Sequence, residues 1–239
     1  MNYSATEVSC YKKEVIPSAL NYTGGKFKLL PQILPLFPKD ADKVVDLFCG
    51  GCNVGININC NKVQFNDSNK YLIGLLNTFR RLSKREVFDW LYKAIDRYNL
   101  SLVSKNGYEY YGCESSKGLG AYNKEGYNKL RADFNCKINQ DDEYFLMLYL
   151  LIVYSFNNQI RFNKKGEFNL PVGKRDFNVK MQDKLANFID RIKSGDYNFS
   201  NSDFRNISLD DFYRYNKKRH PKMPYSEATT SRNTETTCS

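Results

Sequence analysis

Short apolar runs alternate with longer segments of helical periodicity along this chain. Residues 43–48 (KVVDLF) form a compact apolar run followed by a glycine-rich turn, which is typical of a buried parallel strand. Further strands are expected at residues 62–67 and 196–200. Strands that alternate with helices predict an α/β fold built on a parallel sheet.

Most of the helical segments lie between the second and the third strand. Residues 83–99 begin with Ser83 as a candidate N-cap and then place apolar side chains at helical spacing. Residues 104–122 are rich in Gly, Ser and Tyr and are expected to form a loop. The other helices are expected at residues 28–36 (short, because of its prolines), 123–134, 141–156 and 179–192, and after residue 67 with Ser68 or Asn69 as its cap.

Residues 157–173 have a different character, because polar and basic residues are interleaved with Phe, Asn and Gly. This pattern predicts a hairpin with its tip at residues 164–166. Asn, Gln and Arg side chains match base edges in the major groove, and the lysines of this segment can contact phosphates. A solvated hairpin that binds nothing explains the same pattern.

Charge and composition narrow the function classes. The chain has 239 residues with 36 Lys and Arg against 26 Asp and Glu, a net charge of +10, which favours a polyanionic partner without specifying one. The longest apolar run, residues 144–156, is shorter than the ~20 residues that span a bilayer, and residues 1–11 lack the apolar region of a signal peptide. We therefore expect a cytoplasmic protein with no membrane partner. Seven irregularly spaced cysteines and one histidine predict neither a disulfide framework nor a metal site.

Two glycine-containing turns are candidates for a ligand site. Residues 46–55 (DLFCGGCNVG) follow the first strand and let the backbone approach a nucleotide-like ligand. Asp67 ends the second strand, where an acid commonly accepts hydrogen bonds from both ribose hydroxyls. Residues 21–27 (NYTGGKF) place Lys26 where it can pair with a carboxylate. Taken alone, each of these segments also fits an ordinary turn.

Together, these segments occur in an order that resembles the Dam-type DNA adenine-N6 methyltransferases. The resemblance covers about residues 20–212. It rests on the aromatic-x-Gly-Gly-Lys opening, the Asp-x-Phe-x-Gly turn, the strand-ending acid, the Arg-x-Asn-x-x-Gly-x-Phe-Asn-x-Pro-x-Gly hairpin and the Asn-x-Asp-Phe segment at residues 201–204. It implies methyl transfer from S-adenosylmethionine to adenine N6 in duplex DNA, by a bacterial protein or by a phage protein in the host cytoplasm. A phage and a restriction–modification context both stay open.

The resemblance also implies the domain organisation and the site residues. Residues 1–76 and 176–213 would form a Rossmann-like methyltransferase core, and residues 77–175 an inserted, mainly helical target-recognition domain. The cofactor site would consist of Tyr22, Lys26, Phe48, Gly50 and Asp67, with Asp203 and Phe204 beside the adenine of the cofactor. DNA contacts would come from Asn157, Arg161 (reading a guanine), Asn163, Pro171 and Lys174. A GATC-like target and a monomeric protein are expected.

Three departures from the family pattern stand out. Lys174 stands where the family usually has arginine, and Cys52 where a second turn glycine is common. The Asp/Asn-Pro-Pro-Tyr/Phe segment that engages the flipped adenine is absent, since none of the seven prolines follows Asp or Asn; residues 221–225 read PKMPY. No catalytic residue is therefore assigned.

We accordingly expect a core truncated in its C-terminal half, as after a frameshift. A tail at residues 214–239 should be first basic, then polar and disordered. Two alternatives stay open. One is a non-catalytic DNA-binding remnant, or one half of a split methyltransferase that needs a complementing C-terminal half. The other is an S-adenosylmethionine-dependent enzyme that acts on RNA.

Overall fold

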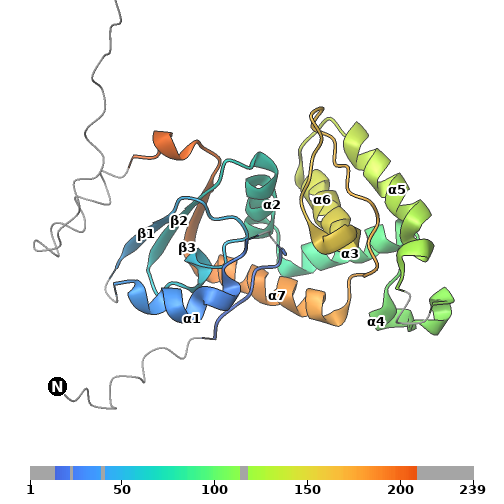
Figure 1. Cartoon of the computed structure of the whole chain (residues 1–239), viewed down its shortest axis with the longest axis horizontal. Helices are drawn as coiled ribbons and strands as arrows, with labels where there is room; N and C mark the ends of the chain where they lie inside the picture. Colours follow the sequence, from blue (N-terminus) through green and yellow to red (C-terminus); the bar gives the residue numbers. More distant parts are fainter. Residues whose placement is uncertain (1–13, 22–23, 39–40, 114–117, 209–239) are drawn as a thin grey trace, which may run out of the picture. The chain divides into compact units, whose positions relative to one another are not determined.

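A computed structural model describes residues 14–21, 24–38, 41–113 and 118–208 (Figure 1). The described residues up to Asn206 belong to one compact unit, and the account below concerns this unit. Tyr22 and the predicted tail lie outside the described residues. The division into a core and a recognition domain stays a prediction.

Three parallel strands form the sheet, in the order β1 (Lys43–Asp46), β2 (Lys62–Asn66) and β3 (Asp196–Ser200). The predicted strands and their parallel pairing are confirmed. The first strand is shorter than predicted, and it is half-buried rather than buried. The reason is its place at an edge, because among the described residues β1 pairs with β2 alone.

The helices agree with the apolar periodicity, and most have polar caps. Asn69 caps its helix by accepting from two backbone N–H groups, and Ser83 forms a capping box with Glu86. The α-helices are α1 (Leu30–Ile33), α2 (Lys70–Arg81), α3 (Lys84–Arg97), α4 (Val103–Asn106), α5 (Gly120–Cys136), α6 (Asp142–Tyr154) and α7 (Val179–Ser194). The short 3-10 turns are Phe27–Leu29, Leu34–Leu36, Gly55–Asn57, Glu109–Tyr111, Phe156–Asn158 and Phe204–Asn206.

The predicted loop at residues 104–122 is partly wrong. It contains most of α4, the turn Glu109–Tyr111 and the first residues of α5. The buried Tyr111 organises this segment, since its hydroxyl accepts from the backbone N–H of Leu102 (2.7 Å) and from the Asn106 side chain (2.8 Å). Composition alone does not reveal such an anchor.

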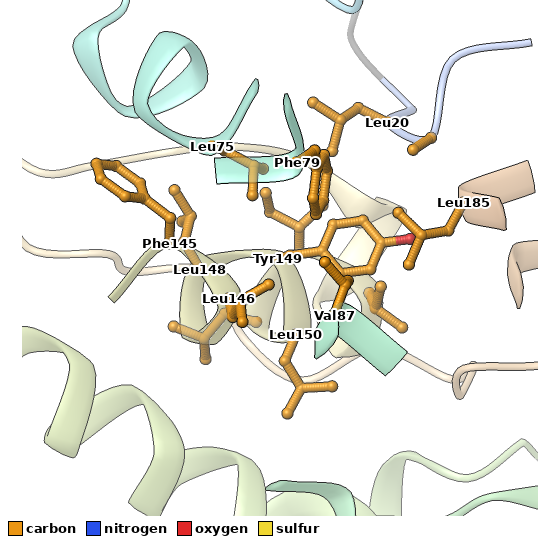
Figure 2. Close-up of a cluster of buried hydrophobic side chains, with 14 of the residues drawn as sticks. Leu20, Leu75, Phe79, Val87, Phe145, Leu146, Leu148, Tyr149, Leu150 and Leu185 are labelled. Carbon is orange, nitrogen blue, oxygen red and sulfur yellow. The ribbon is translucent and has the colours of Figure 1, made fainter. Parts of the chain in front are cut away.

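Helix α6 is the centre of the helical layer. Every residue from 144 to 154 is buried, as expected for a helix that is apolar on all sides. Helices α2, α3 and α5 pack around it, and Figure 1 shows α6 between α2 and α5. Figure 2 shows Tyr149 of α6 beside Phe79 of α2, with ring centroids 5.3 Å apart.

The predicted hairpin follows α6 directly and is confirmed. Antiparallel bridges join Ser155 to Val172 at its base and Phe162 to Phe168 near its tip. In the tip, the backbone N–H of Asn163 donates to the Glu167 carbonyl (2.9 Å). Among the described residues, no helix is both long and apolar enough to cross a membrane.

We predict that Tyr149→Phe stabilises the protein. The Tyr149 hydroxyl is buried among apolar side chains and has no hydrogen-bond partner within the described part of the chain, and an unsatisfied buried group of this kind costs about 1–3 kcal/mol. Urea unfolding should therefore give a higher free energy of unfolding for the variant. Tyr127→Phe is the matched control. Its hydroxyl donates to the Leu170 carbonyl (2.9 Å), so its loss should destabilise by about 1 kcal/mol. Equal destabilisation by both changes would contradict the prediction.

Candidate functional site

A cavity of about 370 Å³ lies where β1 and β2 end. Ligands of open α/β sheets commonly bind at the carboxyl ends of the strands. Four of the residues predicted from the sequence lie together here: Lys26, Phe48, Gly50 and Asp67. The complete lining is Gly24, Gly25, Lys26, Asp46, Phe48, Cys49, Gly50, Gly51, Asn53, Val54 and Asp67.

The turn after β1 is tight despite its cysteine. The backbone N–H of Cys52 donates to the Cys49 carbonyl (2.7 Å), and the N–H of Cys49 donates to the Asn66 carbonyl (2.9 Å). Gly50 has φ 47° and Cys52 has φ 63°. A residue with a side chain pays roughly 1–2 kcal/mol for this left-handed conformation. Cys52 thus retains the geometry of a turn glycine at some cost in strain.

Asp67 ties this turn to the start of α2. One carboxylate oxygen, Oδ2, accepts from the backbone N–H of Gly50 (3.0 Å), and Oδ1 accepts from the N–H of Asn69 (2.9 Å). Each oxygen has a second lone pair for a ligand hydroxyl. The geometry thus permits the predicted ribose contact.

Asp46 is a cavity residue to which the sequence analysis gave no role. It ends β1, and its Oδ2 accepts from the backbone N–H of Gly55 (3.2 Å). Burial raises the pKa of the Asp46 carboxyl, the Gly55 hydrogen bond lowers it, and the nearby Asp67 raises it further, for a net upward shift. The signal was present in the sequence, because Asp46 is a strand-ending acid before a glycine turn.

Phe204 and Asp203 differ in their relation to the cavity. The Phe204 ring lies 5.2 Å from that of Phe48, and both rings are exposed, at 49% and 69%, so they form an apolar rim. The Asp203 carboxylate accepts from the backbone N–H and the Nε of Arg205 (both 2.9 Å), and this side chain holds the pKa of Asp203 at about 2. Asp203 is not part of the cavity lining.

Asn66 is a positioning residue that the sequence analysis missed. Its side chain donates to the carbonyls of Leu47 (3.2 Å) and Ser202 (3.0 Å), and it accepts from the N–H of Ser202 (3.1 Å). It is almost fully buried between the strands. One amide therefore fixes the ends of β1 and β3 relative to the cavity.

The predicted DNA-contacting residues lie along the hairpin. Asn157, Arg161, Pro171 and Lys174 are exposed. Arg161 is oriented across the hairpin, since its Nε donates to Oδ1 of Asn169 (2.8 Å) and its Nη2 to the Asn169 carbonyl (3.1 Å).

Asn163 differs, because its side chain is engaged within the tip. Its Oδ1 accepts from the N–H groups of Lys165 (2.9 Å) and Glu167 (3.0 Å). Its amide donates to the Glu167 carboxylate (2.7 Å). These bonds suit a role in shaping the turn.

Other features of the described residues contribute no predicted site. A larger hollow of about 610 Å³ is lined by residues from α3 to α5, including Tyr92, Tyr110 and Tyr122, and by the start of α7. It contains no predicted site residue and lies away from the strand ends. The described ranges hold no group of three or more His, Cys, Asp or Glu side chains placed to bind a metal.

Comparison with known proteins identifies the family. A family model described as D12 class N6 adenine-specific DNA methyltransferase matches residues 22–217. The chain belongs to this family. The match confirms the resemblance to the Dam-type adenine methyltransferases, and the parallel sheet with its helices agrees with a D12-class methyltransferase core.

Several relatives are similar over most of this chain. Type II methyltransferase M.FokI of Planomicrobium okeanokoites is 37% identical over 196 residues, 81% of this chain and 27% of the relative. Modification methylase StsI of Streptococcus sanguinis is 34% identical over 207 residues, 84% of this chain and 28% of the relative. DNA adenine methylase of Haemophilus influenzae is 26% identical over 179 residues, 73% of this chain and 53% of the relative. This D12-class chain thus spans a quarter to a half of the length of these relatives. Methyltransferases in general use S-adenosylmethionine, and members of this family methylate DNA.

We predict that Asp46→Asn stabilises the free protein in a pH-dependent manner. The raised pKa means that folding disfavours the charged form of this carboxyl. The free energy of unfolding therefore falls as the pH rises from the ordinary pKa of 3.8 through the higher pKa of the folded state, and it recovers as the pH is lowered again. Asparagine keeps the acceptor for Gly55 without the charge. The melting temperature of the variant should exceed that of the parent at pH 7, by about 2–4 °C per kcal/mol, and this difference should shrink towards pH 4.

The exposed Asp183→Asn is the control for this measurement and should show no such trend. A difference between Asp46→Asn and the parent that does not change with pH would contradict the assignment.

Proposed function

We propose that this chain supplies the cofactor-binding and DNA-reading parts of a site-specific DNA adenine-N6 methyltransferase. The observation that carries the proposal is the occurrence of both sites in one compact unit. The strand-end cavity with Lys26 and Asp67 and the hairpin with Arg161 are joined through the same helical layer.

The cavity residues fit S-adenosylmethionine chemically. Lys26 provides a cation for the carboxylate of the methionine part, and Asp46 and Asp67 provide two carboxylates suited to its ammonium group, its sulfonium and the ribose hydroxyls. The exposed rings of Phe48 and Phe204 provide an apolar rim for the adenine. When bound, S-adenosylmethionine supplies an electrophilic methyl group.

The hairpin fits duplex DNA. Arg161 carries a guanidinium that can bind the edge of a guanine bidentately, and Lys164 and Lys165 at the exposed tip provide charges for phosphates. Asn157 stands at an exposed corner with φ 58°, where its side chain can reach the base stack. We further propose that the target is a GATC-like duplex and that the chain is a monomer. Base reading in the major groove favours DNA over RNA, since the deep A-form groove excludes side chains.

Catalysis by this family requires the Asp/Asn-Pro-Pro-Tyr/Phe segment, which does not occur in the 239 residues. The adenine N6 nitrogen is a poor nucleophile, and acceptors aimed at its hydrogens increase its reactivity; such preorganised contacts are worth about a hundred- to a thousandfold each. We propose that a complementing C-terminal half supplies them. It would add a parallel strand beside β1, whose Val44 and Val45 are half-buried.

The decisive experiment is a titration of the purified chain with S-adenosylmethionine, followed by a methyl-transfer assay on unmethylated duplex DNA. We expect binding of both ligands and little or no N6-methyladenine by mass spectrometry, with transfer recovered on adding a D12-class C-terminal half. Robust transfer by the chain alone would contradict the need for complementation. Failure to bind S-adenosylmethionine would contradict the proposed function, and transfer to RNA in preference to DNA would favour an RNA enzyme.

Cofactor binding should depend on Lys26 and Asp67. We expect Lys26→Ala and Asp67→Ala each to weaken S-adenosylmethionine binding roughly ten- to a hundredfold in calorimetry, because each removes a charge-assisted hydrogen bond worth about 1.5–3 kcal/mol. Lys28→Ala is the control for charge, since Lys28 does not line the cavity. Parent-like binding by both variants would place the cofactor elsewhere.

DNA reading should separate Arg161 from Lys164. Arg161→Ala should reduce discrimination between the cognate and a mutated duplex by about 1–3 kcal/mol. Lys164→Ala should weaken all duplexes alike and reduce the salt dependence of binding by about one ion. Titrations at several salt concentrations measure both effects. A uniform loss on Arg161→Ala would restrict Arg161 to phosphate contact.

A further inference from the structure

The returning arm of the hairpin is fixed firmly to α5. Asn135 donates to the Phe168 carbonyl (3.1 Å) and accepts from the Phe168 N–H (2.9 Å). Tyr127 and Arg131 both donate to the Leu170 carbonyl, at 2.9 and 3.0 Å. Four hydrogen bonds with one helix therefore hold this arm, and they do not depend on the conformation of the tip.

The outgoing arm and the tip are bonded to the returning arm, and in addition they contact α2. The ring of Tyr71 stacks on that of Phe162, with centroids 3.8 Å apart and planes 13° apart. The Tyr71 hydroxyl also lies 3.4 Å from the Gly166 carbonyl, a long hydrogen bond. Phe162 stands between Arg161 and Asn163, so this stack lies directly beside the candidate reading arginine and the tip.

Tyr71 lies at the start of α2, which is the point where the cavity is anchored. Asn69 caps the helix by accepting from the N–H groups of Tyr71 (3.1 Å) and Leu72 (3.2 Å). The N–H of Asn69 in turn donates to Asp67, whose other oxygen accepts from Gly50. A short path of hydrogen bonds therefore runs from the cavity turn to the Tyr71 backbone.

Tyr71 lies at the margin of the apolar core, where it is only partly buried and packs against the core. The apolar side chains of Leu72, Leu75 and Phe79 on this helix are fully buried. Tyr71 is only half-buried, and it faces the hairpin. The helix packs on α6 through the former group. Tyr71→Leu keeps an apolar side chain at this margin, so it should disturb the core less than the loss of a fully buried side chain would.

We propose that Tyr71 is a positioning residue that couples the cofactor cavity to the DNA-reading hairpin. The inference rests on the proposed function, since it assumes that Asp67 binds S-adenosylmethionine. A ligand that engages Asp67 orders the start of α2, and the Tyr71–Phe162 stack transmits this order to the hairpin tip. Because such coupling is reciprocal, duplex DNA at the tip strengthens cofactor binding by the same factor. The stack limits this factor to roughly two- to tenfold.

Hydrogen exchange at the tip tests the coupling without any activity measurement. The tip amides of Asn163, Lys165, Gly166 and Glu167 are all hydrogen-bonded, so their exchange reports opening of the tip. In the full chain, saturating S-adenosylmethionine should slow this exchange two- to tenfold. In Tyr71→Leu the slowing should disappear, while calorimetry still shows cofactor binding within about twofold of the parent.

Two further variants keep the test specific. Tyr71→Phe retains the stack and should retain the slowing, which separates the ring from the long hydrogen bond. Tyr92→Leu removes another half-exposed tyrosine, which lies on α3 and lines the separate hollow, and it should behave as the parent. If Tyr71→Leu does not fold, the parent and Tyr71→Phe still give the cofactor-dependent difference.

The outcomes distinguish the coupling from the function on which it rests. No S-adenosylmethionine binding by the parent would overturn both. Binding by the parent without slower exchange at the tip would overturn the coupling alone. Equal slowing in Tyr71→Leu and in the parent would assign the transmission to another contact and would likewise overturn the role of Tyr71.

Discussion

The burial of α6 on all sides is the constraint on which the rest of the structure depends. A helix whose residues 144–154 are all buried needs apolar neighbours all around it, and α2, α3 and α5 provide them. Helix α2 comes directly from β2 and the cavity, and the hairpin leaves directly from the end of α6. One core therefore fixes the cavity and the hairpin to the same support, which is what transfer between two bound molecules requires.

The residues of the cavity lower the stability of the folded protein, whereas the helical core raises it. Asp46 and Asp67 line one small space, and burial and their mutual repulsion raise the pKa of Asp46. Cys52 adds a left-handed backbone in the same turn. Strain and like charge gathered at one site are features that the positively charged ligand proposed above would offset.

Much of the fold could be predicted from the sequence, because apolar periodicity reports burial directly. The three strands, the caps at Asn69 and Ser83 and the hairpin tip were all predicted near their observed places. What failed depended on contacts that leave no local pattern in the sequence: the anchoring of residues 103–111 by the Tyr111 hydroxyl and the half-burial of β1, which among the described residues pairs with β2 alone. At the site, Lys26, Phe48, Gly50 and Asp67 were brought together as predicted. Asn66 was missed because a buried amide between strands has no local pattern.

The way in which the hairpin is held separates its stability from the DNA reading proposed for it. Its base closes through backbone groups, with the N–H of Gly173 donating to the Tyr154 carbonyl (2.7 Å) and that of Leu119 to the Lys174 carbonyl (3.0 Å). A side chain at position 173 would collide with the Ser155 carbonyl, so the glycine is required there. Lys174, in contrast, is held by its backbone while its side chain is exposed. A lysine or an arginine fits the same framework at this position, and only the proposed contact with DNA would differ, a point charge in place of a bidentate fork. Under the proposed function, substitutions at exposed residues of the hairpin would thus change the target sequence without changing the fold.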